Sequence, residues 1–134
     1  MDSRPGVRIR LATASVALVV LLVACGSDGT PTPPTSVRVT TAAAPANACM
    51  DALITGILVP HAAWGIGLQT PGTGELTRPI FPFGYSAVVD GDRLALLDEK
   101  GRLVAHTGDL IQSGGGSIDP GSVVLCGGIE VVPG

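Results

Sequence analysis

The sequence predicts an all-β domain, folded as a small, highly coiled barrel of five or six strands. Short runs of β-branched and aliphatic residues alternate with turn residues between Cys49 and Cys126. No stretch of this region keeps a 3.6-residue apolar period, so we expect little helix in it. Only about 87 residues are available, and closing a sheet into a barrel removes its exposed edges at low cost in chain length.

The first two predicted strands form a hairpin. Residues 52–59 are rich in aliphatic and β-branched side chains, which is typical of a strand. In residues 64–70 large apolar side chains alternate with Gly65 and Gly67, a pattern of a half-buried strand with close backbone approach or sharp coiling. Residues 60–63 are the expected loop between the two.

The second half of the domain predicts three further elements. Residues 93–105 form the clearest hairpin, with two apolar runs around the turn Asp98-Glu99-Lys100-Gly101. Residues 109–118 predict a short strand that runs into a glycine loop. Residues 122–132 predict a closing strand that carries Cys126.

The chain divides into three parts: a targeting peptide (1–24), Cys25 with a linker (25–47), and the domain (48–134). The first ten residues are basic, and an apolar run of fourteen follows and ends at Cys25. Fourteen helical residues span about 21 Å, too little for a bilayer core of about 30 Å. A short apolar helix behind a basic start is typical of a secretory signal.

The tetrapeptide Leu22-Val23-Ala24-Cys25 resembles the lipobox of bacterial lipoproteins. This resemblance implies cleavage before Cys25 and attachment of a diacylglyceryl group to its sulfur. Two fatty chains anchor a protein stably where one holds it only marginally, so we expect the mature protein on the outer face of the cell membrane. An ordinary cleaved signal and a short core helix are the alternatives.

The linker is dominated by Thr, Pro, Ala, Ser and Gly and shows no apolar period. Such a composition cannot bury enough apolar surface to offset the entropy of ordering. We therefore expect residues 26–47 to be a disordered tether that spans at most about 70 Å. Its threonines are either solvated or O-glycosylated.

A disulfide between Cys49 and Cys126 is expected, because export places both thiols in an oxidising compartment. Two buried thiols or a metal pair are the alternatives. A metal pair lacks further ligands at useful spacing, and the sequence predicts neither a metal nor a cofactor.

Two stretches carry a resemblance in fold. The segment GRLVAHTGDLIQSGGG (101–116) resembles the strand, Gly-Asp turn, strand unit of OB-like barrels. Through LALLDEKGRLVAHTGD and FGYSA, residues 48–130 resemble uncharacterised lipoproteins of high-GC Gram-positive bacteria. The resemblance implies a similar fold and no particular activity.

The charge of the domain excludes some partners. From Cys49 onward four basic residues stand against nine acidic ones, a difference of −5. An acidic domain repels phosphate backbones, so nucleic acid is not an expected partner. Direct docking of the domain on anionic lipid is not expected either.

Few residues predict chemistry. His61 and His106 lie in no metal spacing, and Ser86 lacks the second glycine and the helix of a nucleophile elbow. Asp90 and Asp92 flank a glycine and predict a turn, since the later ligands of a calcium loop are missing. Residues 113–117, SGGGS, predict a flexible turn rather than an anion cradle.

All four aromatic residues of the chain lie in one region: Trp64, Phe81, Phe83 and Tyr85. The last three recur at a spacing of two and would share a face of an extended segment. They are interpreted either as rings that cap the barrel or as an exposed binding patch for a peptide, glycan or partner protein.

The leading hypothesis from the sequence is a non-enzymatic binding or structural module, anchored to the membrane outside the cell. An envelope protein or a wall glycan is the expected partner. The second hypothesis is an accessory subunit of a cell-envelope enzyme or transporter. The third is a small hydrolase that uses an aspartate and a histidine.

Overall fold

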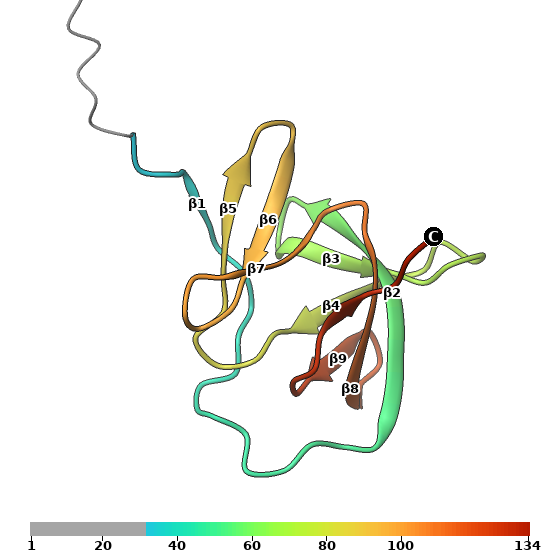
Figure 1. The fold of residues 1–134 in the computed structure, drawn as a ribbon. Coiled ribbons are helices and arrows are strands. Elements are labelled where there is room, and N and C mark those ends of the chain that lie inside the picture. Colours follow the sequence, from blue (N-terminus) through green and yellow to red (C-terminus); the bar gives the residue numbers. More distant parts are fainter. Residues whose placement is uncertain (1–31) are drawn as a thin grey trace, which may run out of the picture. The chain divides into compact units, whose positions relative to one another are not determined.

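The computed structural model describes residues 32–134, and in this range the chain contains strands and no helix (Figure 1). The strands are β1 (Ser36–Val37), β2 (Ala52–His61), β3 (Gly65–Gln69), β4 (Leu76–Ile80), β5 (Ser86–Asp90), β6 (Arg93–Leu97), β7 (Leu103–His106), β8 (Leu110–Asp119), β9 (Ser122–Leu125) and β10 (Glu130–Val131). The all-β prediction is confirmed.

Five strands close into a barrel in the order β2, β3, β4, β9, β8 and back to β2. The β4–β9 pair is parallel and the other pairs are antiparallel. A five-stranded barrel that mixes one parallel pair with antiparallel neighbours is consistent with the predicted OB-like barrel. β10 pairs with β8 beyond the end of β9.

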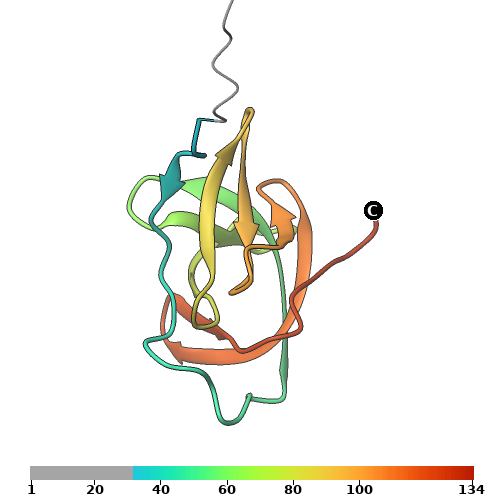
Figure 2. The same cartoon turned by 60° about the vertical axis from the view of Figure 1, so that its left-hand side comes forward.

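A second sheet combines β1 with the three strands that lie between β4 and β8 in the chain. Its strand order is β1, β5, β6, β7, all antiparallel. In both views the hairpin of β5 and β6 stands at one end of the domain, with β8 and β9 at the other (Figures 1 and 2). The predicted hairpins at 52–70 and 93–105 are confirmed, with the second turn at 98–101. The first turn is residues 62–64 rather than 60–63, because Pro60 and His61 still pair with Ile66 and Gly65.

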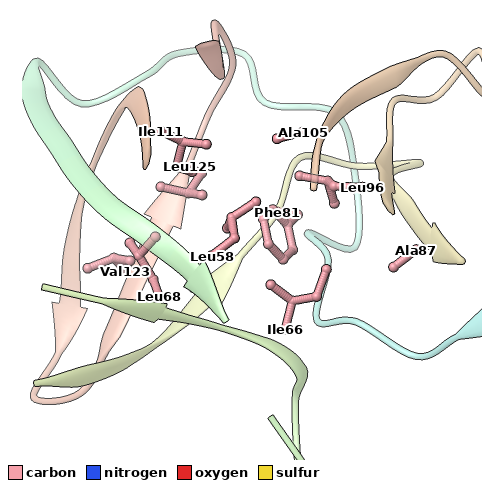
Figure 3. Close-up of a cluster of buried hydrophobic side chains, with 10 residues drawn as sticks. All are labelled: Leu58, Ile66, Leu68, Phe81, Ala87, Leu96, Ala105, Ile111, Val123 and Leu125. Atoms are coloured by element: carbon pink, nitrogen blue, oxygen red, sulfur yellow. The ribbon is translucent and has the colours of Figure 1, made fainter. Parts of the chain in front are cut away.

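Phe81 is fully buried at the centre of the core, where Leu58, Ile66 and Leu96 surround it (Figure 3). The core draws on both sheets, because Leu96 belongs to β6 whereas Leu58 and Ile66 belong to the barrel. Burial of such side chains is the main favourable contribution to folding, about 1.5–3 kcal/mol each.

The glycine run after Ile111 is part of a strand, so the predicted glycine loop is wrong. β8 continues through Gly114, Gly115 and Gly116 to Asp119, paired with β2 on one side and β9 on the other. A Cβ atom on Gly115 would collide with the carbonyl oxygen of Val124. Gly115 is therefore required by the close approach of β9, which no local pattern reveals.

The predicted closing strand is interrupted. β9 ends at Leu125, and β10 begins only at Glu130. Gly127 and Gly128 between them have φ angles of 120° and 63°, a region that favours glycine. The chain turns there before it rejoins β8.

The domain begins earlier than residue 48, so part of the predicted linker is wrong. Residues from Thr32 onward form one compact unit with the rest of the domain. β1 pairs with β5, the amide of Val89 donates to the carbonyl of Thr35, and Val39 packs against the core. Sheet pairing compensates for a low apolar content here. The predicted signal peptide, Cys25 and residues 26–31 lie outside the described residues.

The predicted disulfide is confirmed. Cys49 and Cys126 are bonded across a sequence separation of 77, with their Cα atoms 5.3 Å apart. The bond joins the segment before β2 to the end of β9. Within residues 32–134 no helix is long and apolar enough to cross a membrane.

Candidate binding site

A hollow of about 540 Å³ lies beside the turn between β2 and β3, and we refer to it as the turn hollow. Its walls come from Val37 and Arg38 at the end of β1, from residues 60–63 and Gly65 of the hairpin, and from Leu94 of β6. Three segments far apart in the sequence therefore build it. Its volume falls in the range of small-molecule sites, about 300–1,000 Å³.

The hairpin turn is held by a histidine. Nδ1 of His61 accepts hydrogen bonds from the backbone amides of Ala63 and Trp64, each at 3.2 Å. This acceptor role assigns the ring proton to Nε2. Among the described residues Nε2 has no hydrogen-bond partner, so the ring retains a donor for a ligand at the wall of the turn hollow.

Trp64 stacks on this imidazole, with ring centroids 3.8 Å apart and an interplanar angle of 11°. A Cβ atom on Gly67 would lie 3.6 Å from the indole and 3.5 Å from both Val59 and His61. These are ordinary van der Waals distances, so the indole packs directly over β3 beside Gly67. Trp64 does not line the turn hollow, so it acts on a ligand there only by fixing the orientation of His61.

The turn hollow has a distinct electrostatic character. Arg38 is exposed, and no hydrogen bond or ion pair joins its side chain to another described residue. No acidic residue lines the hollow. One cationic side chain and one neutral N–H donor thus border a space whose remaining lining is apolar.

The predicted aromatic patch is not a single surface. Phe81 lies in the core at 0% exposure, whereas Phe83 is 44% exposed and Tyr85 is half-buried against the core. The spacing argument fails because the chain turns after β4: the amide of Tyr85 donates to the carbonyl of Pro82, and Gly84 has a φ angle of 80°. The prediction that Phe81 belongs to a binding patch is therefore wrong.

Phe83 borders a second, smaller hollow of about 160 Å³, which we call the Phe83 hollow. Its lining is mostly apolar, with Pro82, Pro45 and Leu125 among its walls, and Glu99 is its only charged lining residue. It lies beside Cys126 of the disulfide. A space of this size fits one hydrophobic side chain rather than a sugar or a nucleotide.

The turn between β6 and β7 is organised by Asp98. Its Oδ1 accepts the backbone amides of Lys100 and Arg102, each at 2.9 Å, and its Oδ2 accepts Nε of Arg102 at 3.1 Å. The hydrogen bond from the Arg102 amide is the largest of the contacts that hold the pKa of Asp98 below its usual value. Burial raises the pKa of Tyr85, and the nearby carboxylates of Asp98 and Glu99 raise it further.

A histidine and a carboxylate do meet, but away from both hollows. Nε2 of His106 lies 2.8 Å from Oδ2 of Asp90, with the two side chains 16% and 63% exposed. The backbone amide of His106 donates to Asp109. Neither hollow includes this pair. Its contacts join the β5–β6 turn to β7, and the described residues contain no cluster of three potential metal ligands.

Sequence reasoning missed the two polar residues of the turn hollow. Arg38 was expected in a disordered linker, and His61 was expected to be an ordinary surface residue. One local signal was available, since a histidine at the start of a hairpin turn, three residues before the only tryptophan, favours stacking of the two rings. The meeting of Arg38 with this turn depends on the pairing of β1 and carries no local signal.

Comparison with known protein families, with curated proteins and with solved structures gave no match.

Proposed function

We propose that this protein is a lipid-anchored, extracytoplasmic binding module without catalytic activity, and that its turn hollow binds a saccharide of the cell wall. The single observation that carries the binding proposal is the turn hollow itself: about 540 Å³, lined mainly by apolar residues, with Arg38 and His61 as its two residues that carry polar side chains. The anchoring proposal rests on the lipobox resemblance at Cys25.

The disulfide supports a location outside the cytoplasm. Structural disulfides persist in oxidising compartments and are rare where glutathione and thioredoxin act. The Cys49–Cys126 bond closes nearly the whole domain, so the fold is adapted to such a compartment. A diacylglyceryl group on Cys25 would hold it at the membrane surface without a spanning helix.

The tether is shorter than the sequence predicted. Because β1 begins at Ser36, ten residues separate it from Cys25. Ten extended residues span at most about 35 Å. The domain would therefore work close to the outer membrane face, within the innermost layer of the wall.

Of the two ligand classes that OB folds bind, a saccharide fits the turn hollow better than an oligonucleotide does. OB folds bind oligonucleotides and oligosaccharides beside the loop between their first two strands, which here is the β2–β3 turn. The acidic balance of the domain disfavours an oligonucleotide. Apolar walls with a few fixed donors suit the C–H faces and hydroxyl groups of a sugar. The fold alone assigns no function, so the lining residues carry the argument.

Sedimentation with insoluble wall glycan tests the proposal. The full-length chain should co-sediment, and Ala62→Leu should reduce the bound fraction several-fold because the longer side chain fills the turn hollow. Phe83→Ala is the matched control and should bind as the unaltered chain does, since Phe83 lies outside that hollow. Equal binding by the chain with Ala62→Leu would contradict the proposal.

A second candidate function is an accessory subunit of an envelope enzyme or transporter. The observation that favours it is the Phe83 hollow, which is apolar and sized for one hydrophobic side chain of a protein partner. In that case Phe83→Ala should abolish co-purification of a stoichiometric partner from detergent-solubilised membranes, and Ala62→Leu should not.

A further inference from the structure

We infer that the turn hollow selects a saccharide that bears a carboxylate, with Arg38 as the residue that recognises the acid. This inference rests on the proposed function, since it specifies the class of sugar for the same site. It goes beyond it, because the shape of the hollow is equally suited to a neutral sugar.

The charge around the turn hollow favours an acidic ligand. The domain as a whole is acidic, yet the residues that line the turn hollow include Arg38 and no aspartate or glutamate. Two acidic residues near β5 and β6 have basic partners of their own: Asp90 contacts His106, and Asp109 contacts Arg93. A single positive centre thus faces an otherwise neutral space.

The backbone of Arg38 is held in a fixed position. The preceding residue, Val37, pairs with Ala87 of β5, and the carbonyl of Arg38 lies so close to Gly65 that a Cβ atom there would collide with it. The backbone is therefore clamped between β5 and the hairpin, while the side chain is exposed. The fixed backbone removes one part of the entropy cost of binding, and the planar fork of a guanidinium pairs both oxygens of a carboxylate with less side-chain entropy lost per hydrogen bond.

A carboxylate matches the charge of Arg38 better than a phosphate does. Arg38 supplies one positive charge, which one carboxylate neutralises. A phosphate monoester carries about −1.5 to −2 charges at pH 7 and would keep an excess of negative charge in an acidic domain. The Nε2–H of His61, a neutral donor, suits a hydroxyl or ring oxygen of the same sugar.

The test compares two sugars that differ by one lactyl ether, which carries the acid group. N-acetylmuramic acid is N-acetylglucosamine with a lactyl carboxylate, and each is titrated into the full-length chain in detergent while backbone amide signals are recorded by NMR. We expect about tenfold tighter binding of the acid, the gain typical of one charge-assisted hydrogen bond. The shifted amides should include those of the β2–β3 turn.

Variants assign the selectivity to Arg38. Arg38→Gln should remove the preference for the acid and leave the weaker binding of the neutral sugar, whereas Arg38→Lys should keep part of the preference. Lys100→Gln is the matched control: it removes the same charge at an exposed turn that belongs to neither hollow, and the preference should persist.

Each contrary result of these titrations overturns a particular part of the proposal. Equal affinity of the two sugars overturns the carboxylate inference and leaves the proposed saccharide function in place. Absence of binding for both contradicts the inference and the proposed function together. Tighter binding of N-acetylglucosamine 6-phosphate than of the carboxylate overturns the choice of acid, and a preference that survives Arg38→Gln overturns the role of Arg38.

Discussion

Removal of the Cys49–Cys126 disulfide should cost this domain most of its stability. The bond closes a loop with a sequence separation of 77. The chain-entropy relation assigns about 4.5 kcal/mol to a loop of that length. Natural domains are stable by only about 5–15 kcal/mol, and a small domain lies toward the lower end because it buries less of its surface.

The structure explains why little else replaces this bond. Residues 43–53 before and at the start of β2 are exposed on one side of the link. On the other side, Cys126 is followed by two glycines with positive φ angles. The segment before β2 contributes no buried side chain to this link, whereas Leu125 beside Cys126 is buried, so the disulfide is what holds the exposed segment to the end of β9.

The assay is urea denaturation of the oxidised chain, of Cys49→Ser, of Cys126→Ser and of the double variant. All three variants should lose about 4.5 kcal/mol and about 20–35 °C in Tm. The three losses should be equal, because each variant breaks the same bond once. Reduction of the unaltered chain should reproduce them. A loss below about 1 kcal/mol, or losses that add in the double variant, would refute the reasoning.

Three further predictions concern packing and pH. Phe81→Ala should lower the free energy of unfolding by about 3–5 kcal/mol because the ring is fully buried, while Phe83→Ala should change it by no more than about 0.5 kcal/mol. Similar losses of stability for the two variants in thermal melts would contradict the assignment of Phe81 to the core. Gly115→Ala should lower the free energy of unfolding by about 3 kcal/mol or more, since its Cβ atom would meet the backbone of Val124. Gly116→Ala should cost less, because its Cβ atom would meet the flexible side chain of Met50. The reverse order in urea titrations would contradict the close approach of β9 to β8. Asp98→Asn should be less stable than the unaltered chain at pH 7, because the lowered pKa of Asp98 means that its carboxylate stabilises the fold above the unfolded value of about 3.9. The difference should shrink as the pH falls from there through the lower folded pKa, and a pH-independent difference would be inconsistent with this role.

The hairpins could be predicted because their signals are local. The alternation of large apolar side chains with glycine in residues 64–70 predicts a strand, and the Asp-Glu-Lys-Gly sequence at 98–101 predicts a hairpin turn. The disulfide was predicted from two cysteines near the ends of the domain. The parallel pairing of β4 with β9, which sets the barrel order, joins residues more than forty positions apart. No periodicity within either strand specifies that partner.

The errors share a physical cause, which is tertiary contact that outweighs local composition. Glycines at 114–116 favour a loop by themselves and form a strand because β9 approaches the backbone there. Residues 35–42 lack an apolar period and are ordered by two backbone contacts: residues 35–37 lie along β5, and Thr40 and Ala42 exchange hydrogen bonds with Phe81. Phe81 and Phe83 have the same spacing as two side chains on one face, yet the turn at Gly84 sends one inward and the other outward.

The turn hollow is the part of the molecule that sequence reasoning reached least. The sequence left open whether Trp64 caps the barrel or belongs to a binding patch, and in the structure it stacks on His61. Arg38 and the hairpin are brought together by β1, which the sequence did not predict as a strand. A binding site assembled from a strand edge and a distant turn has no continuous motif to find.

The proposed location outside the cell depends on one chemical group, the modified sulfur of Cys25. Intact mass spectrometry of the protein purified from membranes, read with fragmentation of its first residues, tests it most directly. We predict a chain that begins at Cys25, carries a diacylglyceryl group on that sulfur and contains the Cys49–Cys126 bond. An unmodified Cys25, or a chain that retains residues 1–24, would contradict the account.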